Sequence, residues 1–421
     1  MELEKLRKLH PHHWEKANAI RVLTLDAVAA ANSGHSGMPV GMADVATILF
    51  EKHLKFSTAQ PNGPDRDRFI LSAGHGSMLL YSIAYLCGYA DFDIDQLKNF
   101  RQLGKKTAGH PENFLSDVIE TTTGPLGQGI ANSVGFAIAE ESLRARFGRN
   151  IIDHHTFVIA GDGCLMEGVS QEAISLAGHL RLHKLIVFWD NNNITIDGTV
   201  DLTDSTDQKT RFEASGWEVI EIDGHNPEEI DSAISAAKKS EKPTMIACKT
   251  HIAIGTAAQD TSKGHGALTD PELIKNAREV YQWSHKPFDI PKSIKEQWEQ
   301  AGLEGHKAFK RWQSKLENLS NSKRKEFERI FSGDAPKKLT SAIRKFKKES
   351  SAASPTIATR KSSELTLNAI NSFMQETIGG SADLTGSNNT KSTDMKIFDR
   401  NNRKGRYIHY GIREHAMAAA M

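Results

Sequence analysis

Two short polar motifs, each directly after a predicted strand, carry residues that can bind a metal ion together with a phosphate group. The apolar run at 155–160 predicts a β-strand and leads into a Gly-Asp-Gly motif centred on Asp162. A second apolar run at 184–190 leads into Asn191 and Asn192. Open α/β sheets bind ligands at the carboxyl ends of their strands, so we expect these side chains to lie together. Carboxylate, amide and backbone carbonyl oxygens suit a Mg²⁺ ion that also binds phosphate.

Glycines stand where the backbone of such a site must approach a ligand. Gly161 and Gly163 permit a sharp turn, and three glycines in the run 124–129 precede a predicted helix whose N-terminus favours an anion. Taken alone, the 124–129 run is more often a tight turn needed only for packing, and Gly-Asp-Gly is a weak signal. The paired spacing of Asp162 and Asn192 favours a metal site over a turn aspartate and an ordinary Asx cap.

Four of the 18 histidines follow a glycine within a short motif, which leaves the ring uncrowded and the backbone bent. A ring in that setting is suited to line a polar pocket, and imidazole can donate or accept a proton at neutral pH. By itself each of these histidines is as consistent with an ordinary loop as with a site. The four are His35, His75, His110 and His265.

Strands that alternate with helices predict a parallel sheet flanked by helices on both faces, which is an α/β fold. We predict strands at the start of 67–82 and at 154–160, 184–190, 217–222 and 243–249. Helices are predicted at 14–31, within 122–140, and at 169–182 and 227–239. The first of these helices should stop near 32–34, where Asn, Ser and Gly follow one another.

The length of 421 residues predicts two or three domains. We place a first domain at 1–320 and a linker at 321–354, and we expect a second α/β domain to begin at 355. Lys, Glu and Ser dominate from about 290 to 350, which favours amphipathic helices with solvated faces over a functional basic patch.

Composition restricts the partners and the compartment. The net charge of +1 predicts no basic face, so neither nucleic acid nor an anionic membrane is an expected partner. No apolar run is long enough to span a bilayer, and the charged N-terminus lacks the apolar region of a secretory signal. The three cysteines, Cys87, Cys164 and Cys248, show no paired spacing, which fits a reducing cytoplasm.

The spacing of the two motifs matches the thiamine diphosphate fingerprint, and the wider sequence resembles the transketolase family over essentially its whole length. The matching motifs occur in the family's order. They are SGHSGMPVGMAD (33–44), DRFILSAGHGSMLLYS (67–82), GHPE (109–112), TTGPLGQGIANSVGFAIAE (122–140), GDGCLMEGVSQEA (161–173), DNNNITIDG (190–198), ATRKSSE (358–364), GGSADLTGSN (379–388) and YGIREHAM (410–417).

The resemblance implies a thiamine-diphosphate-binding domain followed by part of a related pyrimidine-binding domain. It also implies the cofactor thiamine diphosphate, with Mg²⁺ (or Ca²⁺ or Mn²⁺) held by Asp162, Asn192 and the backbone carbonyl of Ile194. The other residues that the resemblance places around the cofactor are His75, Gly124, Pro125, Leu126, Gly163, Glu167, Asn192, His265 and Asp383. Of these, Glu167 resembles the acidic residue that links the two active sites of a homodimer.

Glu414 resembles the glutamate that hydrogen-bonds the cofactor's aminopyrimidine ring, and such a group should be buried with a raised pKa. Without the family, it would be interpreted as the partner of Arg413 in a salt bridge. In the homodimer that the resemblance implies, the first domain of one chain binds the diphosphate and metal, and the second domain of the partner supplies this glutamate. His35, His110 and His265 are expected to act on the sugar as catalytic and substrate-binding groups.

Arg360 and Ser387 resemble the residues that hold the substrate's terminal phosphate, and a guanidinium suits that group through bidentate bonds. Without the family, Arg360 would be a surface charge. The family commonly has proline where this chain has Ser36, so we expect a less rigid loop around His35.

The implied function is reversible transfer of a two-carbon ketol unit from a ketose phosphate to an aldose phosphate, in the pentose phosphate pathway or the Calvin cycle. The donor would be xylulose 5-phosphate and the acceptor ribose 5-phosphate or erythrose 4-phosphate. Dihydroxyacetone synthase is an alternative that shares most of these motifs, whereas 1-deoxyxylulose-5-phosphate synthase fits 358–364 and 379–388 poorly. A non-catalytic fragment is the other alternative. The family's pattern continues past Met421, so we expect this chain alone to be inactive.

Overall fold

The computed structural model describes all residues from Met1 to Met421, which form two compact units. The first unit contains residues 1–137 and 154–311, and the second contains residues 138–153 and 312–421. The domain boundaries expected at 320 and 355 remain a prediction.

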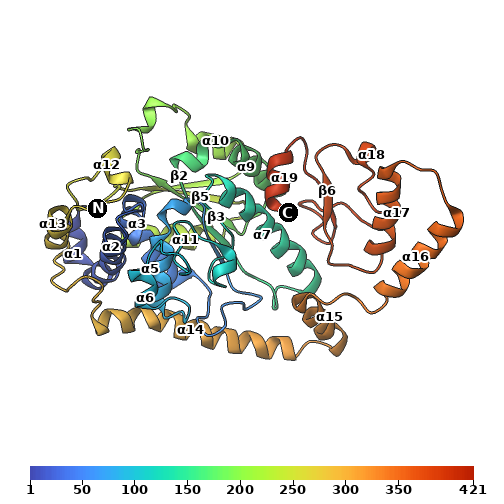
Figure 1. Ribbon diagram of the computed structural model, residues 1–421, viewed down its shortest axis with the longest axis horizontal. Coiled ribbons are helices and arrows are strands. Elements are labelled where there is room, and N and C mark those ends of the chain that lie inside the picture. The colour runs from blue at the N-terminus through green and yellow to red at the C-terminus, as the bar shows by residue number, and fades with distance from the viewer. The chain divides into compact units, whose positions relative to one another are not determined.

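The first unit is built on a parallel sheet of five strands in the order β1-β2-β3-β5-β4, with helices packed around it (Figure 1). The strands are β1 (Arg68–Leu71), β2 (Thr156–Gly161), β3 (Leu185–Asn191), β4 (Glu218–Asp223) and β5 (Thr244–Lys249). Residues of β2, β3 and β5 are buried along almost their whole length, as expected for parallel strands covered on both faces. The predicted strands from 154 onward differ from these by no more than two residues at either end.

The strand register aligns the carboxyl ends of the central strands. Ala160 pairs with Trp189, Gly161 with Asp190, and Asp190 with Cys248. The residues that follow β2, β3 and β5 therefore emerge at one edge of the sheet.

Half of the helices of the first unit fall between strands in the chain order, as in an α/β fold, and the others precede β1 or follow β5. They are α1 (Leu3–Leu9), α2 (Pro11–Ala31), α3 (Gly37–Gly41), α4 (Ala43–Ile48), α5 (Met78–Cys87), α6 (Ile94–Lys98), the start of α7 (Gln128–Phe147), α8 (Asp162–Met166), α9 (Gly168–Leu180), α10 (Gln208–Ala214), α11 (Pro227–Ala237), α12 (Ser262–His265), α13 (Pro271–Tyr281) and most of α14 (Lys292–Glu317). Short turns of other helix types occur at Leu49–His53, Gly74–Gly76, Asn113–Leu115 and Val200–Leu202.

The long helix α2 shows how local sequence sets these boundaries. It begins with Pro11 in its first turn, where proline's missing N–H costs nothing. It ends at Ala31 because Asn32 adopts the left-handed conformation with φ 47°. The stop predicted near 32–34 is confirmed.

The second unit holds a small parallel sheet of two strands, β6 (Gly379–Ser381) and β7 (Tyr407–His409). Its helices are the end of α7, the end of α14, α15 (Asn321–Ser332), α16 (Leu339–Ala353), α17 (Thr359–Asn371), α18 (Thr385–Asn388) and α19 (Glu414–Ala420). Phe147, Ile151, Ile152 and Phe327 form a buried apolar cluster in this unit. The stretch predicted as amphipathic helices with solvated faces contains α15 and α16, whose residues are mostly exposed.

None of the helices combines the length and the apolar character that crossing a bilayer requires.

Candidate active site

A pocket of about 480 Å³ lies in the first unit, where the chain leaves the carboxyl ends of β1, β2, β3 and β5. It gathers most of the residues that the sequence singled out. These are His35, His75, His110, Gly124, Leu126, Asp162, Gly163, Glu167, Asn192, Ile194 and His265. Pro125 lies between two of these lining residues in the chain.

Asp162 is the first residue after β2 and begins α8. Its Oδ1 accepts a hydrogen bond of 2.9 Å from the indole Nε1 of Trp189. Its Oδ2 is buried and has no hydrogen-bond partner. Burial raises the pKa of Asp162 to about 6, and the Trp189 hydrogen bond and the nearby backbone N–H of Asn193 oppose that rise. A buried carboxylate oxygen without a donor is costly unless a cation or another donor reaches it, so this oxygen fits a metal ligand.

Asn192 follows β3, and two residues near it hold its side chain. Its Nδ2 donates to Oδ2 of Asp190 at 2.8 Å, and its Oδ1 accepts from the backbone N–H of Ile194 at 2.9 Å. Asn193 adopts a left-handed conformation with φ 62°, which asparagine tolerates well. The chain therefore turns back at this point, and Asn192 and Ile194 both line the pocket with Asp162.

The loop 124–129 borders the same pocket. Gly124 has φ +152°, and a Cβ there would lie 3.3 Å from the ring of His110. A Cβ at Gly163 would lie 2.9 Å from Cδ1 of Leu126. Both glycines thus allow the loop, α8 and a histidine ring to approach one another closely. An approach of this kind leaves backbone N–H groups free to face an anion such as a diphosphate.

Three histidines from three separate segments of the chain meet at the pocket. The ring centroids of His35 and His75 are 5.1 Å apart, those of His35 and His265 are 5.6 Å apart, and those of His75 and His265 are 5.0 Å apart. Burial, followed by the neighbouring His265, lowers the pKa of His35 to about 4 and that of His75 to about 3. Burial also lowers the pKa of His265. At neutral pH these rings are therefore uncharged, and each offers one donor and one acceptor.

The loop around His35 is held by two hydrogen bonds of Ser36. Ser36 is fully buried, and its backbone N–H donates to the carbonyl oxygen of Gly266 at 2.9 Å. Its hydroxyl accepts from the backbone N–H of Leu268 at 3.3 Å. Serine thus supplies two hydrogen-bonding groups that a proline lacks, and the expectation of a less rigid loop stays a prediction.

Arg101 is a neighbour of the site that the sequence did not single out. Its Nη1 donates to Oγ of Ser33 at 2.9 Å, and its backbone N–H donates to the carbonyl oxygen of Thr107. Burial, with Arg101 as the next cause, lowers the pKa of His110. Arg101 thus contacts the loop before His35 and adds to the effect of burial in lowering the pKa of His110.

Four predicted site residues belong to the second unit. Arg360 lies near the start of α17, Ser387 lies on α18, and Asp383 has a left-handed backbone with φ 64°. Glu414 begins α19. All four side chains are exposed in the single chain. The burial expected for Glu414 stays a prediction, because it concerns a site that a partner subunit would complete.

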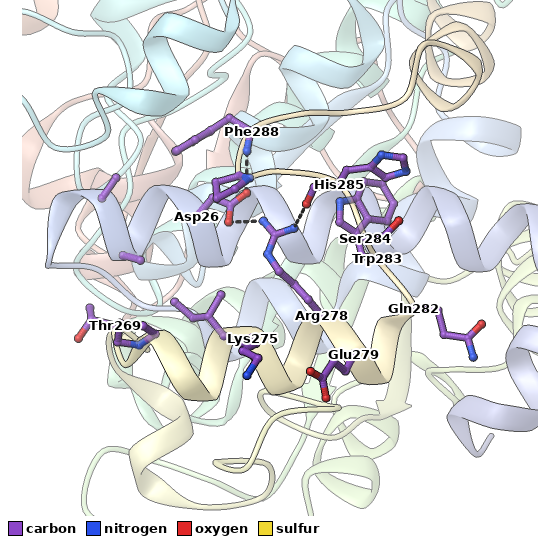
Figure 2. Close-up of a pocket in the computed structure, with 15 residues that line it drawn as sticks. Asp26, Thr269, Lys275, Arg278, Glu279, Gln282, Trp283, Ser284, His285 and Phe288 are labelled. Atoms are coloured by element: carbon purple, nitrogen blue, oxygen red, sulfur yellow. Dashed lines mark hydrogen bonds and ion pairs between the residues drawn. The ribbon is translucent and has the colours of Figure 1, made fainter.

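A second and larger cavity, of about 860 Å³, lies in the first unit between α2, α13 and the segment 283–288 (Figure 2). Arg278 donates to Asp26 and to the carbonyl oxygen of His285, and the N–H of Phe288 also donates to Asp26. Burial raises the pKa of Asp26, and Arg278 opposes that rise. The charges of Arg278 and Asp26 compensate each other. None of the predicted site residues lines this cavity. The smaller pocket is the better candidate, because it holds a buried acceptor without a donor.

Comparison with known proteins gives a consistent result. Residues 12–336 match the family described as "Transketolase, thiamine diphosphate binding domain", and residues 355–421 match "Transketolase, pyrimidine binding domain". The chain is 57% identical to a transketolase of Rhodobacter capsulatus over all of its own length, and 53% identical to one of Cereibacter sphaeroides over 96% of it. It spans 63% and 61% of those relatives.

Solved structures agree with the sequence relatives. A transketolase of Pichia stipitis in complex with sedoheptulose 7-phosphate matches 97% of this chain with a TM-score of 0.92 at 40% identity. A transketolase of Campylobacter jejuni matches 97% with a TM-score of 0.88 at 42% identity. The chain covers 62% of each of these structures.

Proposed function

Because the chain belongs to the transketolase family, we propose that the protein transfers a two-carbon ketol unit between sugar phosphates, using thiamine diphosphate and a divalent metal ion. The observation that carries this proposal is the pairing of Asp162 and Asn192 in one pocket. One offers a buried carboxylate oxygen without a donor, and the other offers an amide held in place by Asp190. A metal-bound diphosphate matches this donor set.

The residues present fit the cofactor. Asp162, Asn192 and the Ile194 carbonyl would hold Mg²⁺, for which Ca²⁺ or Mn²⁺ could substitute. The loop 124–129 and Gly163 would face the diphosphate, with His75 and His265 beside it. When bound, thiamine diphosphate would supply a nucleophilic carbon that adds to the ketose carbonyl and a cationic ring that takes up the electron pair of the broken carbon–carbon bond.

The uncharged histidines support a role in proton transfer at the substrate. His35 and His110 line the pocket, and their pKa values are lowered. A neutral imidazole can accept a proton from a sugar hydroxyl and return it, which charged rings could not do. We assign them, together with His265, to the sugar's oxygen atoms. The donor would be xylulose 5-phosphate and the acceptor an aldose phosphate.

The second unit would supply groups to a site completed across a homodimer. Glu414 is exposed in the single chain, and a glutamate that must share a proton with a cofactor ring needs a dry environment. We infer that a partner subunit covers it, with Glu167 at the junction of the two sites. Arg360 and Ser387 would bind the substrate's phosphate. The three buried, free cysteines support the predicted cytoplasmic location.

The direct test is a coupled assay on the protein at its full natural length, with xylulose 5-phosphate and ribose 5-phosphate as substrates. We expect glyceraldehyde 3-phosphate to form only when thiamine diphosphate and a divalent metal are both added. Turnover that persists after dialysis against excess EDTA, with no cofactor returned, would contradict the proposal. Formaldehyde as a better acceptor than ribose 5-phosphate would favour the dihydroxyacetone synthase alternative.

A further inference from the structure

Two consecutive residues at the end of β3 each make a hydrogen bond to one of the proposed metal ligands. Trp189 contacts Asp162, and Asp190 contacts Asn192. Neighbouring residues of a strand point to opposite faces of a sheet, so the two contacts are made on different sides of β3. We propose that Trp189 and Asp190 are positioning residues that aim both side-chain ligands at the metal. This inference rests on the proposed cofactor site.

The strand register explains how Trp189 reaches its ligand. Trp189 pairs with Ala160 on the neighbouring strand, and Asp162 lies two residues further along the chain. The indole N–H can only donate, and it is directed at Oδ1 of Asp162 at 2.9 Å. Both groups are buried. Trp189 therefore fixes the rotation of the carboxylate and leaves Oδ2 as the oxygen without a partner.

Asp190 sets the orientation of the Asn192 side-chain amide. Without a fixed partner, an asparagine amide can rotate by half a turn with little change of shape. Oδ2 of Asp190 accepts from Nδ2 of Asn192 at 2.8 Å. This contact requires the amide nitrogen to face Asp190, so the carbonyl oxygen must face away from it. That oxygen accepts one backbone N–H, from Ile194, and its second lone pair remains for a cation.

Asp190 is itself held from the next strand. The hydroxyl of Thr250 donates to Oδ1 of Asp190, so both carboxylate oxygens accept a hydrogen bond. Asp190 pairs with Cys248 on β5, and Thr250 lies two residues beyond that partner. Asp190 is only 1% exposed. Mutation of residues that hydrogen-bond to metal ligands commonly changes metal affinity by about 10- to 100-fold.

The test measures Mn²⁺ affinity by electron paramagnetic resonance, in the full-length protein with saturating thiamine diphosphate. The variants are Trp189→Phe, which keeps an aromatic ring but loses the N–H, and Asp190→Leu, which keeps the approximate size but loses the acceptor. Trp217→Phe is the matched control, because its indole also donates to a buried acceptor, the carbonyl oxygen of Ile174, at 2.8 Å. Thermal melting establishes that each variant is folded.

We expect Trp189→Phe and Asp190→Leu each to raise the Mn²⁺ dissociation constant at least tenfold, with Trp217→Phe unchanged. If Asp190→Leu does not fold, Thr250→Val replaces it, with Thr244→Val at the start of β5 as its control. A smaller rise in the dissociation constant is then expected for Thr250→Val alone. Equal affinities for Trp189→Phe and Trp217→Phe would overturn the inference for Trp189. If Asp162→Ala loses Mn²⁺ binding but Trp189→Phe and Asp190→Leu do not, the positioning role is overturned and the proposed metal site is not. Full Mn²⁺ binding by Asp162→Ala would overturn the proposed metal site and this inference together.

Discussion

Ser36 donates its backbone N–H to the carbonyl oxygen of Gly266 at 2.9 Å, and this bond joins the loop of His35 to the loop of His265. The Ser36 hydroxyl adds a second connection by accepting from the N–H of Leu268. The two histidine rings, with centroids 5.6 Å apart, are thus held by loops that are themselves tied together. Their spacing is therefore a property of the backbone as well as of side-chain packing.

Replacing Ser36 with proline should loosen this arrangement. Ser36→Pro removes the N–H donor and the hydroxyl, and it leaves the half-buried Gly266 carbonyl without this partner, which costs about 1 kcal/mol. We expect a lower melting temperature and a several-fold higher KM for the ketose donor in the full-length protein. Ser36→Ala keeps the backbone bond and should show a smaller rise in KM. If Ser36→Pro and Ser36→Ala have the same KM, the backbone bond does not position the histidines.

Removing the carboxylate of Asp162 should weaken the binding of thiamine diphosphate with Mg²⁺. Asp162→Ala deletes the buried oxygen that has no other partner, and we expect at least a tenfold loss of affinity, about 1.4 kcal/mol. Isothermal titration calorimetry with and without EDTA measures this affinity for thiamine diphosphate. The control is Asp201→Ala, because Asp201 is exposed on the segment after Ile194. Cofactor binding of normal strength in excess EDTA would show that the metal assignment is mistaken.

The sequence predicts the parts of this site that depend on local order along the chain. Asp162 and Asn192 were found because each follows an apolar strand, and parallel strands bring their carboxyl ends to one edge. Trp189 was not found, because a tryptophan in an apolar strand is usually a core residue. Asp190, Ser36 and Arg101 act through partners on other segments, and their hydrogen bonds exist only once those segments are folded together.

Arg360 should act on the substrate's phosphate and not on the cofactor. It is exposed near the start of α17, where a guanidinium is available for bidentate bonds. In the full-length protein, Arg360→Ala should raise KM for xylulose 5-phosphate about tenfold or more and change KM for hydroxypyruvate much less. Lys361→Ala, one residue further along the same helix, is the matched control. An equal loss with both donors would indicate that Arg360 has a structural role instead.

The stability of the fold should fall on the acid side of neutrality, and His155 should account for part of that fall. His155 lies just before β2, and its ring stacks on Phe157 at a centroid distance of 5.8 Å. Burial lowers its pKa to about 4, although nearby Asp67 opposes that shift. In the unfolded chain the histidine pKa is about 6.5, so between pH 6.5 and pH 4 the unfolded state binds a proton that the folded state does not.

The free energy of unfolding should therefore decrease as pH falls through this window, by at most about 2 kcal/mol at pH 5 from this one histidine. His155→Phe keeps an aromatic ring beside Phe157 and removes the titrating group. Differential scanning calorimetry at pH 8 and pH 5 compares the two proteins. At pH 8 the histidine is neutral in both states, so any difference there reports packing alone. From pH 8 to pH 5, the melting temperature of the variant should fall less than that of the unmodified protein. Equal falls would show that His155 does not titrate as its burial predicts.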